Sequence, residues 1–301
     1  MTDLTLAVVA DIHHGRDTFT KKGSVALREL DRFLERAREA GADAVIDLGD
    51  RISDVDRETD KALLAEVADR FGQVNCPRFH VNGNHDRAFM KAEDNGEALG
   101  QQVVTRSVDL GAARLVIWQP DVILTREKGF SLQPGDLGGL AGILDESDQR
   151  TILISHVPLS GQSMTGNYWF EDNVAHARYA TEQAAIRAVL AAAPCSIVAL
   201  AGHVHWNSLT TVDGTAHLTL QSLTDTWTTF PHATGSSATL KLSGETLSWQ
   251  VGGRDPLGLT LSFPHRKRRP VDRLPRFADL TDDPVETYRV MAETEAMAVP
   301  A

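Results

Sequence analysis

Hydrophobic positions at the start of the chain change from a strand pattern to a helical one. Residues 4–10 form an unbroken apolar run, which is typical of a strand covered on both faces. Leu27 and Leu30 then begin a helical spacing of apolar residues, with Ser24 as the expected N-cap and Gly41 as the expected C-terminal stop. The chain is therefore predicted to open with a strand, a loop and a helix.

This unit of strand and helix recurs through the first two thirds of the chain. Further apolar runs of strand length lie at residues 44–48, 78–81, 114–118, 151–155 and 196–201. Helical patterns occur between some of these runs, around residues 64–71 and 181–193. Such an alternation of strands and helices predicts an α/β fold.

The pattern changes after residue 205 to short alternating segments with turn residues between them. These segments predict antiparallel strands at residues 208–212, 217–221, 238–242 and 246–251. The apolar periodicity then fades, and a last helix is expected only around residues 285–297. We therefore predict one domain over residues 1–252 and a C-terminal extension over 253–301 that wraps the core or contacts a neighbouring subunit of a homo-oligomer.

The charge balance argues against a nucleic-acid partner. Lys and Arg total 30 against 41 Asp and Glu, which gives a formal net charge of -11. A general polyanion-binding surface would require a basic face. The one basic cluster, at residues 265–269, is interpreted as a solvated loop or an oligomer contact.

Cysteine usage and the apolar runs predict a cytoplasmic protein without a membrane span. Cys76 and Cys195 cannot form a disulfide framework, and their spacing matches no zinc or redox motif. The first apolar run is too short for a signal peptide and has no positively charged region before it. No later run reaches the roughly 18 apolar residues that a membrane helix needs.

The candidate chemistry lies where the predicted strands end, which is where open α/β sheets bind ligands. The polar residues at these ends are Asp11, His13, Asp50, Asn84, His85, Asp86, His156, His203 and His205. Taken singly, each fits a turn, a cap or a surface histidine. Together they form a nitrogen and oxygen ligand set without cysteine, which suits Mn, Fe or Zn and is too rich for one tetrahedral zinc. Two metal ions are therefore expected.

Five motifs that carry these residues resemble those of the calcineurin-like metallophosphoesterases in order and approximate spacing. They are Asp11-Ile12-His13, Gly49-Asp50, Gly83-Asn84-His85-Asp86, His156 and Gly202-His203-Val204-His205. The resemblance covers roughly residues 6–206. It implies a four-layer αββα sandwich of two mixed sheets flanked by helices.

The resemblance also implies a role for each residue. One metal would be bound by Asp11, His13 and His205. The second would be bound by Asn84, His156 and His203, with Asp50 bridging both ions. His85 would stand beside the leaving group, positioned by Asp86.

The chemistry expected of such a site is hydrolysis of a phosphate ester. Two metal ions lower the pKa of water from 15.7 to about 7 and stabilise both oxygens of an in-line displacement. A metal-bridging hydroxide would then attack, and His85 would protonate the departing alkoxide. A positioned acid of this kind contributes a factor of about 10² to 10⁴.

The substrate is less constrained by the sequence. GDRISD and SHVPL depart from the patterns of protein Ser/Thr phosphatases, whereas SHVPL and GHVH resemble the bacterial branch that acts on cyclic nucleotides and glycerophosphodiesters. We predict a small-molecule phosphodiesterase. The alternatives are a phosphomonoesterase or nucleotidase on the same site, or a catalytically silent scaffold like the retromer subunit of the family.

Three further residues are candidates for substrate contact. Tyr168 and Trp169 lie in a long loop after His156, where they either stack on a base or pack the loop onto the core. His14 follows His13 and either touches substrate or supports a ligand.

Overall fold

The apolar runs pair into two mixed sheets, and the first sheet gathers strands from both ends of the chain. The computed structural model describes residues 3–265, 286 and 289. The first sheet has six strands in the order β12-β11-β10-β1-β2-β3. Their bounds are β1 Leu4–Val9, β2 Ala44–Asp47, β3 Arg78–His80, β10 Ser237–Ser243, β11 Thr246–Gly252 and β12 Leu257–Ser262.

The second sheet is built from the middle of the chain. It also has six strands, in the order β4-β5-β6-β7-β9-β8. Their bounds are β4 Arg106–Asp109, β5 Arg114–Ile117, β6 Thr151–Ile154, β7 Ile197–Ala201, β8 Ser208–Val212 and β9 Thr215–Thr219.

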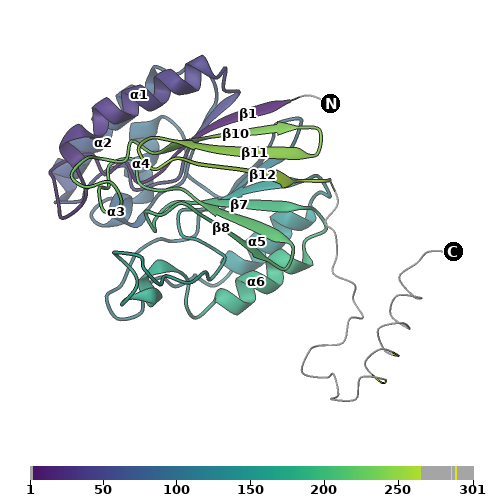
Figure 1. Ribbon diagram of the computed structural model, residues 1–301. Coiled ribbons are helices and arrows are strands. Elements are labelled where there is room, and N and C mark those ends of the chain that lie inside the picture. Colours follow the sequence, from purple (N-terminus) through teal and green to yellow (C-terminus); the bar gives the residue numbers. More distant parts are fainter. Residues whose placement is uncertain (1–2, 266–285, 287–288, 290–301) are drawn as a thin grey trace.

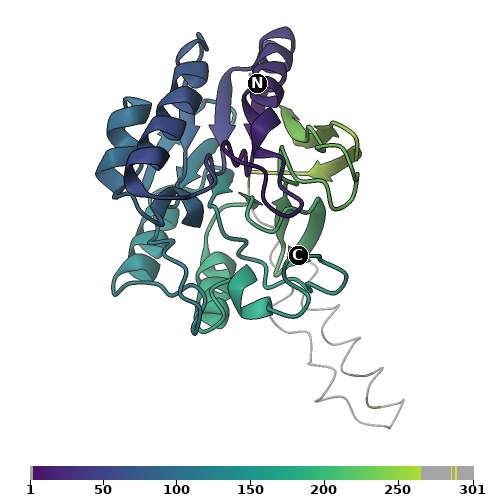
Figure 2. The ribbon, with the colours of Figure 1, turned by 90° about the vertical axis from the view of Figure 1, so that its left-hand side faces the viewer.

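Helices cover the outer face of each sheet, as Figures 1 and 2 show. Helices α1 (Ala26–Glu39) and α2 (Arg57–Gly72) lie on the first sheet. Helices α5 (Asp136–Asp145) and α6 (Gln183–Ala192) lie on the second. Two shorter helices, α3 (Asn84–Arg87) and α4 (Ala92–Leu99), follow β3, and α4 contacts α2. The predicted four-layer αββα sandwich is confirmed.

The period of two along each strand explains the layers. In β1, Leu6 and Val8 point into the core between the two sheets, whereas Ala7 and Val9 pack against α1 and α2. In the second sheet, Ile152 belongs to the same central core. A strand with both faces covered is apolar throughout, which is why β1 reads as a continuous hydrophobic run.

The boundaries of several elements differ from the sequence predictions. The N-cap of α1 is Val25 and not the predicted Ser24. Ser24 lies in the 3-10 turn Gly23–Val25, where its amide and hydroxyl both donate to the carboxylate of Asp17. The strand expected at 217–221 runs over Thr215–Thr219. Five of the strands and α-helices in the described residues were not predicted: β4, β12, α3, α4 and α5.

The C-terminal segment is described only in part. Strand β12 lies in the segment predicted as an extension and pairs antiparallel with β11. The helix predicted around residues 285–297 lies largely outside the described residues, as does the basic cluster after His265. None of the helices in the part of the chain that the structure describes is long and apolar enough to cross a membrane.

Strand direction places the functional residues. Strands β1, β2 and β3 run parallel in the first sheet, and β5, β6, β7 and β9 run parallel in the second. The carboxyl ends of parallel strands meet at one edge of a sheet. Loops from both sheets therefore converge where these edges lie side by side.

Candidate metal centre

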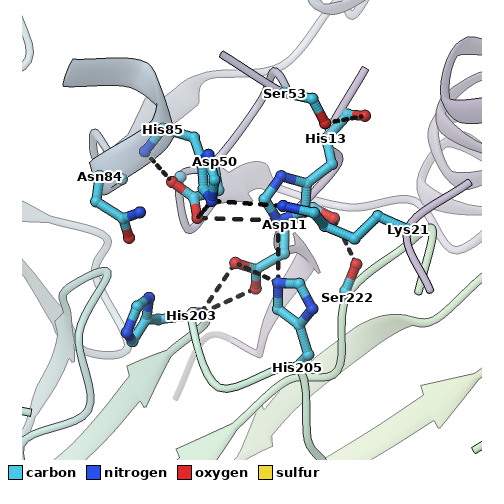
Figure 3. Close-up of polar contacts among 12 residues, drawn as sticks. Asp11, His13, Lys21, Asp50, Ser53, Asn84, His85, His203, His205 and Ser222 are labelled. Carbon is cyan, nitrogen blue, oxygen red and sulfur yellow. Dashed lines mark hydrogen bonds and ion pairs between the residues drawn. The ribbon is translucent and has the colours of Figure 1, made fainter. Parts of the chain in front are cut away.

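The predicted ligands of the first metal meet between the carboxyl ends of the two sheets (Figure 3). Asp11 and His13 follow β1, and His205 follows β7. The Nε2 atoms of His13 and His205 lie 3.0 Å apart, and Nε2 of His205 lies 3.6 Å from a carboxylate oxygen of Asp11. All three side chains are buried. They offer one group of converging ligand atoms, all within 4.8 Å of one another.

A second group of ligand atoms lies beside the first. Asp50 follows β2, and its Oδ2 lies 3.4 Å from Nε2 of His156, which follows β6. The same ring nitrogen lies 3.2 Å from Oδ1 of Asn84. His203 completes a group with Asp50 and His156. Because Oδ2 of Asp50 is also 3.9 Å from Nε2 of His13, this carboxylate stands between the two groups.

The backbone is strained at most of these residues. A positive φ is uncommon outside glycine and costs about 1–3 kcal/mol. In the described chain, five of the predicted ligands have one: Asp11 (51°), His13 (46°), Asp50 (55°), His203 (67°) and His205 (48°). Strain of this kind gathers at functional sites, where the surrounding structure holds it in place.

Glycines in the motifs make the close approach of these loops possible. A Cβ atom at Gly83 would collide with the carboxylate of Asp50, and one at Gly202 would lie 2.6 Å from Oδ2 of Asp11. The backbone amide of His203 donates to that same Asp11 carboxylate at 2.9 Å. A side chain at Gly83 would therefore push apart two loops of the first sheet, and one at Gly202 would push apart loops of the two different sheets.

Hydrogen bonds to backbone carbonyls fix which ring nitrogen of His156 and of His203 faces the centre. The Nδ1 atom of His156 donates to the carbonyl of Leu48 at 2.8 Å, and Nε2 of His203 donates to the carbonyl of His176 at 2.8 Å. Carbonyls only accept, so the opposite ring nitrogens carry lone pairs. Metal-binding histidines are oriented in the same way. The donor set therefore fits two divalent cations.

Burial and charge pull the histidine pKa values in opposite directions. Burial lowers the pKa of His203 to about 3, so this ring is neutral at pH 7. Burial also lowers the pKa of His156, but the charge of Asp50 outweighs it and raises the value to about 9. The carboxylates of the centre thus attract positive charge, which a metal ion would supply in place of protons.

Asp225, which was not predicted, orients the ring of His205 in the first ligand group. Its buried carboxylate accepts from Nδ1 of His205 at 2.6 Å and from the indole of Trp169 at 2.8 Å. The residue lies in the loop after β9, where no motif marks it. The carboxylate leaves Nε2 of His205 available to bind a metal ion and makes it more basic.

Replacing Asp225 with alanine should weaken the first metal site. Loss of the partner frees the His205 ring to rotate and to change tautomer, which typically costs about 10- to 100-fold in metal affinity. Dissociation constants for Mn²⁺, measured by competition with a chelator, check this. The Asp225→Asn variant is the matched control, because its amide oxygen still accepts from His205 and should retain most of the affinity. Equal Mn²⁺ affinity in Asp225→Ala and the unmodified protein would contradict the assignment.

The prediction that Asp86 positions His85 is wrong. Nδ1 of His85 bonds the carboxylate of Asp54 instead. The buried carboxylate of Asp86 accepts from the backbone amides of Asp50 and Gly83, each at 2.9 Å. The reason is that α3 begins at Asn84, so Asp86 turns back under the helix start toward the loop after β2. Asp86 therefore fixes the position of Asp50, and Asp54 orients His85.

The three candidates for substrate contact have different surroundings. Trp169 lies in the centre, with its ring 5.9 Å from that of His205. Tyr168 packs edge-on against Trp169 and is exposed at the rim. His14 instead bonds Glu66 of α2 at 2.9 Å. The loop after His156 thus reaches the ligand cluster through Trp169, whereas the ring of His14 has a partner on α2.

Comparison with solved structures identifies the fold. A dimetal phosphatase from Danio rerio has a TM-score of 0.69 at 17% identity, and the match covers 87% of this chain and 99% of that one. The chain has the metallophosphoesterase fold. A purple acid phosphatase from yellow lupin matches over 87% of this chain and 54% of its own, with a TM-score of 0.58 and 12% identity.

A further match extends over nearly the whole chain. A putative 5'-nucleotidase from Staphylococcus aureus covers 98% of this chain and 58% of its own, with a TM-score of 0.50 and 14% identity. The sequence itself matches no protein-family model and no curated protein. At these identities the likeness establishes the metallophosphoesterase fold, and the function must be argued from the site.

Three residues at the centre escaped the sequence prediction: Lys21, Asp54 and Asp225. Asp54 lies in GDRISD, four residues after Asp50. An acidic residue this close to a predicted ligand could have been named as a candidate site residue. Lys21 lies in a polar loop after β1 and carries no pattern. Both Lys21 and Asp225 reach the centre only through contacts between distant parts of the chain.

Proposed function

We propose that the protein is a two-metal hydrolase of small phosphodiesters. The observation that carries the proposal is the pair of ligand groups on either side of Asp50, with the imidazole of His85 facing the same carboxylate. Asp11, His13 and His205 would hold one ion, and Asn84, His156 and His203 the other. Bound there, the two ions would activate water and neutralise charge on the phosphoryl group. Mn, Fe and Zn all suit these ligands.

His85 is placed to protonate the leaving oxygen. Its backbone amide donates to Oδ1 of Asp50 at 2.9 Å, so the first turn of α3 presents the ring to the centre. The bond from Nδ1 to Asp54 leaves Nε2 facing the centre, 4.0 Å from Oδ2 of Asp50. An alkoxide is a poor leaving group, and a positioned acid removes its charge as the bond breaks.

The rim of the centre supports a small substrate with an apolar or planar group. Phe19 and Tyr168 are exposed there, and both pack edge-on against Trp169. Aromatic rings of this kind stack on flat groups and exclude water. The excess of acidic residues disfavours a nucleic-acid substrate. A cytoplasmic location and oligomer contacts through residues 253–301 remain predictions.

Phosphomonoesters are the second candidate substrates. The observation in their favour is a buried lysine, Lys21, whose ammonium lies 3.5 Å from Nε2 of His85. A monoester carries one more negative charge than a diester at neutral pH, and an added cation benefits it more.

Metal content and a substrate comparison test the proposal. The chain purified in Mn²⁺ should hold two metal ions and hydrolyse bis(p-nitrophenyl) phosphate faster than p-nitrophenyl phosphate. Cyclic nucleotides, glycerophosphodiesters and nucleotides then extend the comparison to natural ester groups. Fewer than one metal ion per chain, with no hydrolysis of any of these esters, would favour the alternative of a silent scaffold.

The His85→Ala variant should keep both metal ions and lose turnover. We expect kcat to fall by about 10² to 10⁴ for esters with alkoxide leaving groups, because the imidazole that would protonate the departing oxygen is lost. The loss should be smaller for p-nitrophenolate, which leaves without a proton. Steady-state rates on the two ester types, together with metal analysis, measure this. An equal loss on both types would argue against His85 as the proton donor.

A further inference from the structure

Lys21 is a buried cation that the metal-binding pattern does not account for. The side chain is only 7% exposed, and Figure 3 shows it extending from its loop into the centre. Its backbone is held on both sides, since it exchanges hydrogen bonds with Thr18 at 2.9 and 3.0 Å and forms a bridge with Asp225. The loop between β1 and α1 therefore delivers this ammonium to a fixed place.

The ammonium has too few partners for its burial. In the described part of the chain, its one hydrogen-bonding contact is Nε2 of His85 at 3.5 Å, and no carboxylate oxygen lies within 4.0 Å. The ring of Trp169 covers it at 5.5 Å. An ammonium has three protons to donate, and a buried charge without partners is costly. The ammonium lies beside His85 at the candidate metal centre, where an anionic oxygen would be a favourable partner for its free protons.

We propose that Lys21 binds a non-bridging oxygen of the phosphoryl group, so that the substrate is held by this ammonium as well as by the metal ions. The inference rests on the proposed function for the identity of the anion. Lys21 and His85 face the same space, so the lysine would contact the phosphoryl group on the side where the ester oxygen departs. Trp169 shields the contact from water, which strengthens it.

If Lys21 served only to stabilise the fold, its replacement would have a different effect from the one expected of an anion-binding residue. Four carboxylates act on the ammonium from a distance: Asp11, Asp50, Asp54 and Asp225. If balancing them were its task, removing the charge would destabilise the protein. Two bound metal ions would supply far more positive charge than the lysine does, so the lysine is not needed for balance in the loaded protein. Its removal should then affect anion binding and leave the fold intact.

The test compares Lys21→Met with Lys22→Met, both loaded with two metal ions. Methionine keeps most of the length of the side chain and removes its charge. Lys22 is the next residue along, and it pairs with Asp17 at 3.2 Å outside the centre. Binding of inorganic phosphate is measured by calorimetry, metal content by elemental analysis and the melting temperature by circular dichroism.

We expect Lys21→Met to bind inorganic phosphate about 10- to 100-fold more weakly than the unmodified protein, the range for one lost charge-assisted hydrogen bond. Both variants should hold two metal ions and melt as the unmodified protein does, and Lys22→Met should bind phosphate normally. Phosphate affinity in Lys21→Met within twofold of the unmodified value would overturn the inference, as would an equal loss in Lys22→Met.

The two proposals fail separately. If the unmodified protein hydrolyses phosphate esters but Lys21→Met binds phosphate normally, the role of Lys21 is wrong and the proposed function stands. If phosphate binding depends on Lys21 but no ester is hydrolysed, the anion site stands and the proposed function is wrong. A lower melting temperature in Lys21→Met with normal phosphate affinity would assign the lysine a structural role.

Discussion

An Asp50→Ala variant is expected to lose both metal ions and all measurable phosphoester hydrolysis together. The carboxylate is the group that the two ligand sets share, with Oδ2 at 3.4 Å from His156 and 3.9 Å from His13. Its other oxygen accepts from the amide of His85, so the start of α3 would also lose a partner. Two nearby cations repel each other, and removing the anion between them weakens both sites.

Elemental analysis after reconstitution in Mn²⁺ measures the loss. The matched control is Asp31→Ala, which removes a half-exposed carboxylate of α1 that pairs with Arg70 of α2 at 3.0 Å. This control should keep two ions. An Asp50→Ala protein that retained two ions at full occupancy would refute the role of Asp50 as the shared ligand.

The second large effect concerns stability and involves Arg51. This arginine is fully buried, and it bonds Asp47 at 2.7 Å and the carbonyl of Val81 at 2.9 Å. It also lies 3.1 Å from the carboxylate of Asp86. The guanidinium therefore joins the ends of β2 and β3 beneath the metal ligands. Its removal would leave two buried carboxylates without a counter-charge.

We expect Arg51→Leu to reduce the free energy of unfolding by about 3–5 kcal/mol, the usual cost of breaking a buried ion pair by removing one partner. Urea denaturation of the metal-free protein measures this without a contribution from bound ions. Arg28→Leu is the comparison, because Arg28 is largely exposed and its partner Glu29 keeps a second ion pair with Arg32. That variant should lose less than about 1 kcal/mol. Similar losses in both would refute the importance of the buried network.

The convergence of most candidate ligands could be predicted because each of these residues follows a strand. Strand-length apolar runs such as residues 4–10 and 196–201 mark their own ends in the sequence. Parallel strands bring their carboxyl ends to one edge within a sheet, so the residues after β1 and β2 could be expected to meet. The meeting of Asp11 with His205, which follows a strand of the other sheet, was implied only by the family resemblance. Both are in the cluster that the structure forms.

The supporting residues could not be predicted in the same way. Asp225 reaches His205 from a loop after β9, and Lys21 reaches His85 from the loop after β1. A lone aspartate or lysine in a polar loop is ordinary, and only the packing of the two sheets places these in the centre. The error over Asp86 has the same origin, because neighbours in sequence point to different partners once α3 begins.

The predicted boundaries of elements were wrong where a local side-chain contact competed with the hydrophobic pattern. Ser24 was predicted as an N-cap, but it lies in a 3-10 turn and its hydroxyl donates to Asp17. Helix α1 begins two residues later. Strand β12 carries alternating exposed positions at the edge of the first sheet, so its apolar signal is weak. Such features depend on neighbours that the sequence does not reveal.

Anomalous diffraction from crystals grown with Mn²⁺ tests the central claim most directly. The account predicts two peaks between the carboxyl ends of the two sheets: one among Asp11, His13 and His205, the other among Asn84, His156 and His203, with Asp50 in contact with both. A single peak, or peaks away from these side chains, would contradict it.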